Sequence, residues 1–548
     1  MKTACPLDCY DACDVDFKDD KITGDLCPHL NHYDKYQQIT TPTFKGKDIT
    51  MGDALLKLKE ILVSSKDILH YRGSGNFALM QEVTDHFFAS FGATLTDGSL
   101  CDGAGEAGIL EGRGVNINMP ISEITKSEVV IFWGRNPHTT NSHILPLLKG
   151  KTIIVIDPIK TKIAKTADLH IQIKPRGDFY LAMLLSRFLH IEGGCDVDFL
   201  EKYAEDYEDF YELTQTIRIK KTLDKIDVTL GDIGDLLALI QNKKVAIVCG
   251  VGIQKYRDGA DIMRAIDAFG VNLGLHGKEG CGVAYLGNSK DGISSPFNTN
   301  AKRVSKVDAK FEDFESVFIQ GANPLSQMPN SLRVKESLTK VKNIIYFGLY
   351  ENETSQIADL VIPAKDFLAK NDIRSSYSYS CLKEMPKVID TKYGISEYDL
   401  AKYLCDEFEV KLEDEKFYLE HFKNSKVIEK KQTLDEFEFL DSIDLGRVDK
   451  NKLHLITPKS PKSLNSQFNR DTFVYINSSL GFCENQLIKI STQDGSVELK
   501  VKICEDLRDD CVMIYSGTKG VNNLTPSVYS YSGKSACYQE NQVILQQV

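Results

Sequence analysis

Short apolar runs alternate with helical periodicity between residues 51 and 347. The apolar runs predict strands at 67–72, 128–133, 152–157, 245–249, 316–320 and 343–347. Between them, apolar residues at helical spacing predict helices that include 51–62, 81–92, 178–190 and 259–270. Because a helical crossover returns the chain to the same edge of a sheet, such strands pair in parallel. We therefore expect an α/β fold with two doubly wound units.

The C-terminal part of the chain has a different pattern. From residue 453 onward, apolar and polar residues alternate in HLITP, TFVYIN, LIKIST, SVELKVKIC and CVMIYS, and turn residues such as Asp494 and Gly495 separate these runs. This alternation predicts a compact β-barrel. The preceding region, 378–450, is charged and rich in helical patterns, and we expect it to be a solvated connector.

Composition limits the classes of function. A chain of 548 residues is long enough for several domains, and 42% hydrophobic with 26% charged residues is typical of a soluble globular protein. The net charge of -12 disfavours a general nucleic-acid binder, which needs clustered cations against phosphates. No run approaches the roughly 20 apolar residues of a membrane helix, and the start, MKTACPLDC, has neither an apolar segment nor a twin arginine. We expect a cytoplasmic protein without a membrane span.

Four cysteines, Cys5, Cys9, Cys13 and Cys27, lie within one short segment. Thiolates so close in sequence can converge on one point with little chain between them. Zinc sites usually space two ligands two to four residues apart and then repeat the pair, whereas the spacing here is C-x3-C-x3-C-x13-C. This arrangement favours an iron–sulfur cluster. A zinc site and unliganded thiols stay open as alternatives.

Turns rich in glycine and asparagine or aspartate follow four of the predicted strands, at 133–137, 157–158, 250–254 and 321–324. Ligands of parallel α/β sheets bind at the carboxyl ends of strands, where glycine lets backbone N–H groups approach phosphates. One such turn alone is a common connection between a strand and a helix and does not indicate a ligand. Four together predict a long ligand with several phosphates.

Several motifs occur in a characteristic order: CPLDCYDAC, VVIFWGRNPHTTNSH, IDPIKTKIAKTADLHIQIKPRGD, GVGIQ, GKEGCGVAYLGN, FIQGANPLSQ, ENETSQIADLVIPA, LITPKSPKSLNSQF and VNNLTP. In these motifs, over nearly its whole length, the chain resembles molybdopterin oxidoreductases of the dimethyl sulfoxide reductase superfamily. The resemblance implies a bis-molybdopterin guanine dinucleotide cofactor with molybdenum or tungsten, together with a 4Fe-4S cluster. It also implies two Rossmann-like units around a central cofactor and a C-terminal double-psi-type β-barrel.

The resemblance implies limits for the domains. An iron–sulfur segment would occupy 1–45, and a first, discontinuous α/β domain would combine 46–120 with 311–440. A second α/β domain, which binds a dinucleotide, would occupy 121–310. The barrel that closes over the cofactor would occupy 441–548.

The resemblance also implies roles for particular residues. The cluster would be held by Cys5, Cys9, Cys13 and Cys27. One guanine dinucleotide would be lined by Gly134, Asn136, Asp157, Pro175 and Asp178, with the two carboxylates accepting from guanine or ribose donors. The rest of the cofactor cradle would come from Gly250, Gly252, Gln254, Gly321, Asn323, Glu353 and Thr354. The barrel would close over both pterins through Thr457, Asn465, Ser466, Gln467 and Asn523.

The protein ligand of the metal in this superfamily comes from a loop ahead of the WGxNP strand, which here reads TDGSLCDGAGEAG. Cys101 is the thiol in this loop, and a soft thiolate suits the metal. Ser99 and Asp102 are the alternative oxygen ligands, and a small buried cysteine in a turn is the structural alternative. Candidates for proton transfer near the cofactor are Asp102, Glu106, His138 and His143.

Two departures from the family bear on function. The family often has a basic residue after the fourth cluster cysteine, and this chain has Cys27-Pro28-His29, where His29 could substitute in electron relay. Formate dehydrogenases pair the metal-bound residue with an adjacent His and a PLRGQ-like run, where this chain has Cys101-Asp102 and GKEGCG. Formate is therefore not the favoured substrate.

The favoured hypothesis is an oxidoreductase that transfers an oxygen atom or a hydride on a small molecule, with electrons passing through the cluster to an iron–sulfur or NAD-linked partner. One alternative is a nonredox, hydratase-like enzyme of the same fold. Another is a nicotinamide-dependent dehydrogenase, because residues 73–78 with Asp97 imitate a dinucleotide fingerprint. A third is a noncatalytic subunit of an electron-transfer complex.

Overall fold

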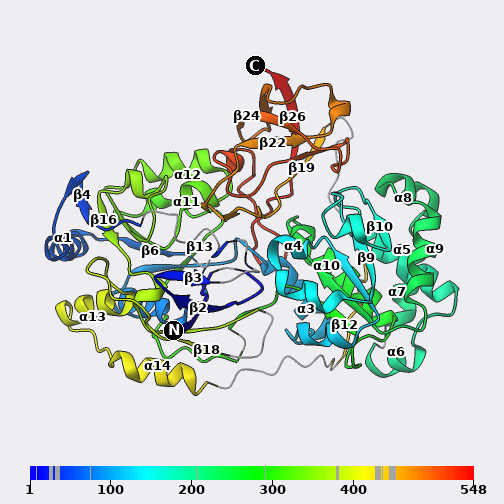
Figure 1. Cartoon of the computed structure of the whole chain (residues 1–548), viewed down its shortest axis with the longest axis horizontal. Coiled ribbons are helices and arrows are strands. Elements are labelled where there is room, and N and C mark those ends of the chain that lie inside the picture. Colours follow the sequence, from blue (N-terminus) through cyan, green and yellow to red (C-terminus); the bar gives the residue numbers. More distant parts are fainter. Residues whose placement is uncertain are drawn as a thin grey trace.

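The computed structural model of the chain describes residues 1–7, 9–23, 27, 29–30, 38–73, 76–204, 206–290, 292–377, 382–425, 434, 436–443 and 452–548. Two α/β units lie side by side, with the C-terminal β-domain above the junction between them (Figure 1). The N-terminal strands lie in front of this junction (Figure 1). Among the described residues, no helix is both long and apolar enough to cross a bilayer.

The first unit contains an eight-stranded sheet in the order β13-β7-β6-β14-β15-β16-β4-β5. Its strands are β4 (Thr43–Phe44), β5 (Lys47–Asp48), β6 (Ile68–Arg72), β7 (Thr94–Asp97), β13 (Arg303–Ser305), β14 (Ser316–Gln320), β15 (Asn343–Gly348) and β16 (Leu360–Pro363). The strands from β13 to β16 are parallel, and β4 and β5 add an antiparallel edge. Three of the six predicted strands, 67–72, 316–320 and 343–347, lie in this sheet as β6, β14 and β15. Their apolar sequences follow from burial on both faces, because helices cover each side of a parallel sheet.

Helices cover both faces of this sheet. One face packs on α1 (Met51–Ser64), α2 (Val83–Phe91) and α13 (Glu397–Glu407), through residues such as Leu58, Phe88 and Leu404. The other face packs on α12 (Ser331–Leu338), through Val334 and Leu338. The short helix α11 (Pro324–Gln327) follows β14 at the edge of the sheet. The unit is therefore doubly wound, as the alternation of strands and helices predicts.

The second unit contains a parallel five-stranded sheet in the order β10-β9-β8-β11-β12. Its strands are β8 (Val129–Trp133), β9 (Thr152–Ile156), β10 (Leu169–Ile171), β11 (Val245–Cys249) and β12 (Gly282–Ala284). The helices of this unit are α3 (Gly103–Arg113), α4 (Pro137–Thr140), α5 (Asp178–Ile191), α6 (Val197–Tyr203), α7 (Tyr207–Gln215), α8 (Ile219–Ile226), α9 (Leu230–Ile240) and α10 (Gly259–Asn272). Every residue of β8 and of β11 is buried, as expected for central parallel strands.

Two elements, α3 and β13, lie close to the predicted domain limits but pack with the unit across the limit. Helix α3 packs on α10 of the second unit, and a Cβ atom at Gly108 would meet the backbone of Ala260, so glycine permits this close approach. Strand β13 pairs with β7 of the first unit, although it precedes residue 311. Helix α3 therefore belongs to the second unit, and strand β13 belongs to the first unit.

The C-terminal domain is a closed barrel in the order β19-β25-β22-β24-β23-β26. Its strands are β19 (Leu453–Ile456), β22 (Phe473–Ile476), β23 (Leu487–Ser491), β24 (Ser496–Ile503), β25 (Cys511–Met513) and β26 (Gln542–Gln547), and a hairpin of β20 (Ser463–Leu464) and β21 (Gln467–Phe468) lies between them in sequence. Alternate residues such as Val474, Ile488, Val501 and Val543 fill the interior. The predicted barrel is confirmed, and β26 is the strand that the sequence pattern did not reveal.

The N-terminal segment forms a small antiparallel sheet of β1 (Lys2–Ala4), β2 (Asp14–Lys18) and β3 (Lys21–Thr23). It packs near a hairpin of β17 (Asp372–Arg374) and β18 (Lys383–Met385), where Val15 and Met385 share one apolar cluster with Leu464 of the barrel domain. The segment with the four cysteines is therefore held between the larger domains.

The region 378–450 is not the solvated connector that its charge predicts. Helices α13 and α14 (Glu415–Lys423) pack on the first unit through Leu404 and Phe422. The described residues 436–443 form no helix, and Phe437 and Phe439 are buried in the core of the second unit. The reason is that the two phenylalanines stand at alternate positions, so both rings face the core while Glu436 and Glu438 face solvent. Residues 378–381, 426–433, 435 and 444–451 of this region lie outside the described part of the chain.

Candidate functional site

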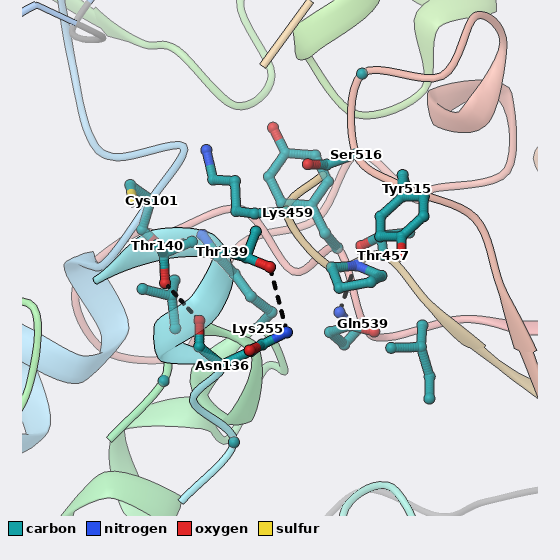
Figure 2. A pocket seen from close by; sticks show the side chains of 18 of the residues that line it. Cys101, Asn136, Thr139, Thr140, Lys255, Thr457, Lys459, Tyr515, Ser516 and Gln539 are labelled. Carbon is teal, nitrogen blue, oxygen red and sulfur yellow. Dashed lines mark hydrogen bonds between the residues drawn. The ribbon is translucent and has the colours of Figure 1, made fainter. Parts of the chain in front are cut away.

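The carboxyl ends of strands from both sheets meet at one cavity of about 620 Å³. The first unit contributes the residues after β6, β7, β13 and β14, and the second unit contributes those after β8, β9 and β11. The barrel domain closes the cavity, so that Cys101 and Asn136 lie on one side and Thr457, Tyr515 and Gln539 on the other (Figure 2). Open α/β sheets bind ligands at this edge, and here two such edges share one space.

The cavity brings together twelve of the residues predicted to contact the cofactor or the metal, which are Cys101, Gly134, Asn136, Asp157, Pro175, Asp178, Gly250, Gly252, Gly321, Thr457, Asn465 and Gln467. Seven others are absent from its lining, which are Asp102, Gln254, Asn323, Glu353, Thr354, Ser466 and Asn523. The proton-transfer candidates Glu106, His138 and His143 are also absent from the lining.

Four of the residues outside the lining form a polar network behind Gly321. Asn323 Nδ2 donates to Glu353 Oε2 at 2.8 Å and to Ser466 Oγ at 3.1 Å, and Thr354 Oγ1 donates to Asn323 Oδ1 at 2.8 Å. Arg470 of the barrel domain forms an ion pair with Glu353 at 2.6 Å. These residues hold the first unit against the barrel, and thereby position the lining.

The remaining residues outside the lining also have partners in the protein. Gln254 Oε1 accepts from Gly105 N at 2.5 Å and so links the turn after β11 to α3. Asn523 Nδ2 donates to Ser496 O at 3.3 Å within the barrel domain. Asp102 stands directly before α3, and its backbone N–H donates to Ser99 Oγ at 3.1 Å.

The loop with Cys101 is fixed by contacts that sequence reasoning missed. Ser99 Oγ accepts from the backbone N–H of Cys101 at 2.9 Å. Lys255 Nζ donates to Leu100 O at 2.8 Å and also to Cys101 O. From the C-terminal domain, Ser535 Oγ donates to Cys101 O at 3.3 Å. The feature of the sequence that could have identified Lys255 is its position directly after the GVGIQ turn.

Two buried carboxyl groups share one end of the cavity. Burial, together with the charge of nearby Asp178, raises the pKa of Asp157 to about 7. Burial raises the pKa of Asp178 to about 6, although the Trp133 Nε1–H group donates to its Oδ1 at 2.8 Å and lowers it. Buried carboxylates need hydrogen-bond donors. This pair is therefore suited to a ligand that presents several N–H or O–H groups.

Glycine is required where the turns after β8 and β11 touch. Gly134 has φ +61°, and a Cβ atom there would lie 2.5 Å from Ile253. A Cβ atom at Gly250 would meet the carbonyl group of Gly134. The two turns pack backbone to backbone, which leaves their outer surfaces to line the cavity.

The cavity is basic although the whole chain is acidic. Its lining contains eight lysine and arginine residues against three aspartates. The cations are Arg72, Arg135, Lys160, Lys162, Lys165, Lys255, Lys306 and Lys459. Arg135 is only 5% exposed, and its Nε and Nη2 atoms have no hydrogen-bond partner among the described residues. A buried guanidinium without a carboxylate partner favours an anionic ligand.

The four N-terminal cysteines gather next to the cavity, and Cys9 and His29 line it. Cys5, Cys13 and Cys27 are buried. Burial raises the pKa of Cys9 to about 12, whereas the pKa of Cys27 is lowered because Cys13 donates to it. Backbone N–H groups reach two of the sulfur atoms, from Leu7 to Cys5 at 3.4 Å and from Leu30 to Cys27 at 3.3 Å.

The arrangement of these thiols suits a multi-iron cluster. In a cluster each thiolate binds a different iron, so the four sulfur atoms need not touch one ion. Within the described ranges, no group of three His, Cys, Asp or Glu side chains has the geometry to hold a single metal ion. His29 is 4% exposed, its Nε2 lies 3.4 Å from Ser460 O, and its ring also contacts Cys27. His29 is therefore a buried side chain that joins the cysteine segment to Ser460 of the barrel domain.

Comparison of the chain with known proteins and protein families places it in one family. The model of the molybdopterin oxidoreductase family matches residues 48–406. The probable oxidoreductase YyaE of Bacillus subtilis (strain 168) is 27% identical over 73% of this chain and 67% of its own length. The assimilatory nitrate reductase catalytic subunit of the same strain is 23% identical over 50% of this chain and 44% of its own length. The dimethyl sulfoxide/trimethylamine N-oxide reductase of Rhodobacter capsulatus is 23% identical over 50% of this chain and 41% of its own length.

The alignments thus cover about two thirds of YyaE and less than half of the two reductases. Among solved structures, acetylene hydratase from Pelobacter acetylenicus superposes with a TM-score of 0.72 at 13% identity, covering 100% of both chains. A likeness at this identity concerns the fold. It confirms the predicted architecture of α/β units with a C-terminal barrel.

Proposed function

Because this chain belongs to the molybdopterin oxidoreductase family of the dimethyl sulfoxide reductase superfamily, we propose that it is a molybdenum or tungsten enzyme with a bis-molybdopterin guanine dinucleotide cofactor. The proposed reaction is transfer of an oxygen atom or a hydride on a small molecule. The observation that carries this proposal is the cavity at which the carboxyl ends of both parallel sheets meet.

The residues of the cavity fit two anionic dinucleotides. Eight cations against three carboxylates suit pyrophosphate groups. The unpartnered Arg135 and the Oδ1 atom of Asn136, which is also buried without a hydrogen-bond partner, are open to a ligand. Asp157 and Asp178 would accept from the donors of a guanine base. The glycine turns 134 and 250 would bring backbone N–H groups to the phosphates.

We assign Cys101 as the protein ligand of the metal. It lies half-buried in the cavity lining, on a loop held by Ser99, Lys255 and Ser535. A ligand on so constrained a loop is positioned before the cofactor arrives. When bound, the metal and its pterins supply the redox chemistry, and the chain supplies position, a shielded pocket and the anion-binding groups.

The proposed 4Fe-4S cluster is held by Cys5, Cys9, Cys13 and Cys27, and His29 and Arg135 line the cavity together with Cys9. Arg135 is 4.5 Å from the ring of Tyr10, and both line the cavity together with Cys9. His29 contacts Cys27 and also lines the cavity. These two groups can take the place of the basic residue that the family often has after its fourth cysteine. Electron relay to a partner protein and a cytoplasmic location stay predictions from the sequence.

A nonredox, hydratase-like reaction is the second candidate. The fold likeness to acetylene hydratase and the Cys27-Pro28-His29 sequence favour it. The nicotinamide alternative has weaker support, because the family model that matches residues 48–406 is that of molybdopterin oxidoreductases. Of its fingerprint residues, Gly73 lines the cavity, and Ser74 and Gly75 lie outside the described residues. Turnover with a reduced viologen dye distinguishes a redox enzyme from a hydratase, and bound pterin distinguishes an enzyme from a noncatalytic scaffold.

The proposal is tested by metal analysis of the purified protein together with acid release of a fluorescent pterin and a guanine nucleotide. We expect molybdenum or tungsten and two pterins for each chain. The Cys101→Ser variant should change the electron paramagnetic resonance signal of the metal and reduce its content. Cys195→Ser is the matched control, because Cys195 is also half-buried but is absent from the cavity lining. Protein without pterin would contradict the proposed function.

A further inference from the structure

Two cations lie at neighbouring strand ends on either side of the strand that leads to Cys101. Arg72 is the last residue of β6, and Lys306 directly follows β13. Both strands pair with β7, and the backbone N–H of Lys306 donates to Asp97 O at 2.9 Å at the end of β7. Arg72, Lys306 and Cys101 all line the cavity. The two cations are therefore on the same rim of the sheet as the proposed metal ligand.

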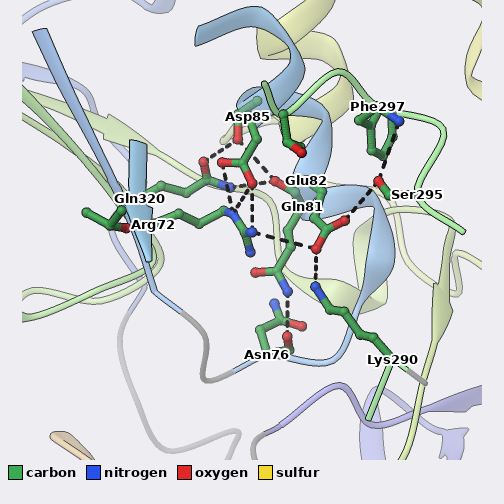
Figure 3. A network of polar contacts seen from close by, with 12 residues as sticks. Arg72, Asn76, Gln81, Glu82, Asp85, Lys290, Ser295, Phe297 and Gln320 are labelled. Atoms are coloured by element: carbon green, nitrogen blue, oxygen red, sulfur yellow. Dashed lines mark hydrogen bonds and ion pairs between the residues drawn. The ribbon is translucent and has the colours of Figure 1, made fainter. Parts of the chain in front are cut away.

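Arg72 is held rigidly by a buried acidic partner. Its Nε atom donates to Asp85 Oδ2 at 3.0 Å, and its Nη2 atom donates to the same oxygen at 2.7 Å. Glu82 lies 3.6 Å from Nη2, and Lys290 pairs with Glu82 from its other side (Figure 3). His70 Nδ1 lies 3.1 Å from Asp85 Oδ1. Burial would raise the pKa of Asp85, but Arg72 and His70 hold it well below its usual range.

This network leaves donors that have no acceptor in the protein. Among the described residues, none accepts from the Nη1 atom of Arg72, and none forms a side-chain hydrogen bond or ion pair with Lys306. Lys306 is 9% exposed. Arg303 also lies near Lys306 but is exposed to solvent. Among the groups that are at least half-buried, three cations, Arg72, Lys290 and Lys306, face two carboxylates, Asp85 and Glu82, so one positive charge is uncompensated. A buried charge without a partner is costly.

We propose that Lys306 and Arg72 form a binding site for a small monoanionic substrate with two or more oxygen acceptors, such as an oxyanion or a carboxylate. This inference rests on the proposed function and names the substrate class for that site. A single negative charge would balance the single uncompensated cation. The Nη1 atom of Arg72 and the ammonium group of Lys306 would each donate to a different oxygen.

A phosphate group of the cofactor is the other source of the same chemistry. Three further lysines of the lining, Lys160, Lys162 and Lys165, follow β9 in the second unit, near the carboxyl pair of Asp157 and Asp178. They supply positive charge at the end of the cavity that we assign to a guanine dinucleotide. Lys306 belongs instead to the rim that carries Cys101. The position of Lys306 therefore favours a substrate anion.

The protonation of Lys306 supports this geometry. Burial, together with the positive charges of Arg72, Lys290 and Arg303, lowers the pKa of Lys306 to about 7, and Asp85 offsets part of this shift. At pH 8 the free amine is therefore mostly neutral. A bound anion favours the charged form, so anion binding at pH 8 should take up nearly one proton from the buffer. At pH 6 the uptake should be small, because the ammonium group is already formed.

The test is isothermal titration of nitrate and of formate into the purified oxidised holoenzyme, in two buffers of different ionisation enthalpy. We expect at least one anion to bind to the wild type with proton uptake at pH 8. Lys306→Met should weaken binding by on the order of tenfold to a hundredfold, as expected for the loss of a charge-assisted hydrogen bond, and should abolish the proton uptake. Lys306→Arg should retain binding. Lys302→Met is the matched control, since exposed Lys302 is on the same segment.

Each result separates the competing explanations. Equal affinity of the wild type and Lys306→Met, or no binding of either anion to the wild type, would overturn the anion site. Loss of guanine nucleotide from Lys306→Met would assign Lys306 to a cofactor phosphate and also overturn it. If the wild type contains no pterin but still binds the anion through Lys306, the proposed function fails and the anion site stands.

Discussion

Asp157 should make the cofactor-free protein less stable at neutral pH than it would be with asparagine at this position. Burial raises the pKa of Asp157 from 3.8 to about 7 in the folded chain. Between these values the folded chain binds more protons than the unfolded chain, so the free energy of unfolding falls as the pH rises. A shift of about three pKa units at about 1.36 kcal/mol for each unit corresponds to about 4 kcal/mol. This cost is complete above pH 7 and is relieved as the pH falls toward 4.

The Asp157→Asn substitution keeps the shape of the side chain and removes its titration. We expect the variant without cofactor to be more stable than the wild type by about 4 kcal/mol at pH 8, with a much smaller difference at pH 4. The assay is urea unfolding followed by the fluorescence of Trp133, which is the single tryptophan of the chain and donates to neighbouring Asp178. Its signal therefore reports on this end of the cavity.

The control is Asp224→Asn, because Asp224 is exposed on α8 of the same unit. It should leave the pH profile unchanged. The cofactor-loaded protein should show the opposite effect, since a neutral amide cannot accept from guanine donors as a carboxylate does, and Asp157→Asn should release more guanine nucleotide on dilution. Parallel pH profiles of stability for the wild type and Asp157→Asn would refute the reasoning.

Three other substitutions test the framework of the site. Arg113→Met should lower the free energy of unfolding by about 3–5 kcal/mol in urea melts, because it removes the arginine that pairs with buried Asp267 at 2.6 Å and, among the described side chains, leaves only His276, at 3.3 Å, beside that carboxylate; a loss below 1 kcal/mol would contradict this. Gly250→Ala should reduce the pterin content measured after acid release, because its Cβ would meet the carbonyl group of Gly134, and full pterin content would disprove the tight contact. Thr50→Ala should cost about 1 kcal/mol, since Thr50 Oγ1 caps α1 by accepting from Asp53 N at 3.1 Å; a circular dichroism melt with an unchanged midpoint would argue against it.

The sequence predicts the central strands well because their composition follows from burial. Strands such as β8 and β11 are apolar at every position, since helices cover both faces of a parallel sheet. Strand β26 was missed because its sequence, QVILQQ, ends in polar residues and only Val543 is fully buried. The segment at Phe437 and Phe439 was misjudged because a high density of acids conceals two core residues.

The candidate site was predictable where a turn follows a strand and less so where contacts join distant segments. The turns at Gly134, Asp157 and Gly250 line the cavity as the sequence pattern indicates. Asn323 and Glu353 were predicted as cofactor contacts but lie behind the lining, because their amide and carboxylate groups bond to each other. Lys306 could not be found from the sequence, since a single lysine has no motif and its significance comes from Arg72 on another strand.

The loop with Cys101 is completed by the C-terminal domain, so the shape of the site depends on the docking of that domain. Ser535 donates to Cys101 O across 434 positions of sequence, and the Ala536 N–H group donates to Ser99 O at 3.0 Å. The two α/β units alone therefore leave this side of the cavity without its brace. The cavity takes its full shape only when the C-terminal domain is docked on both units.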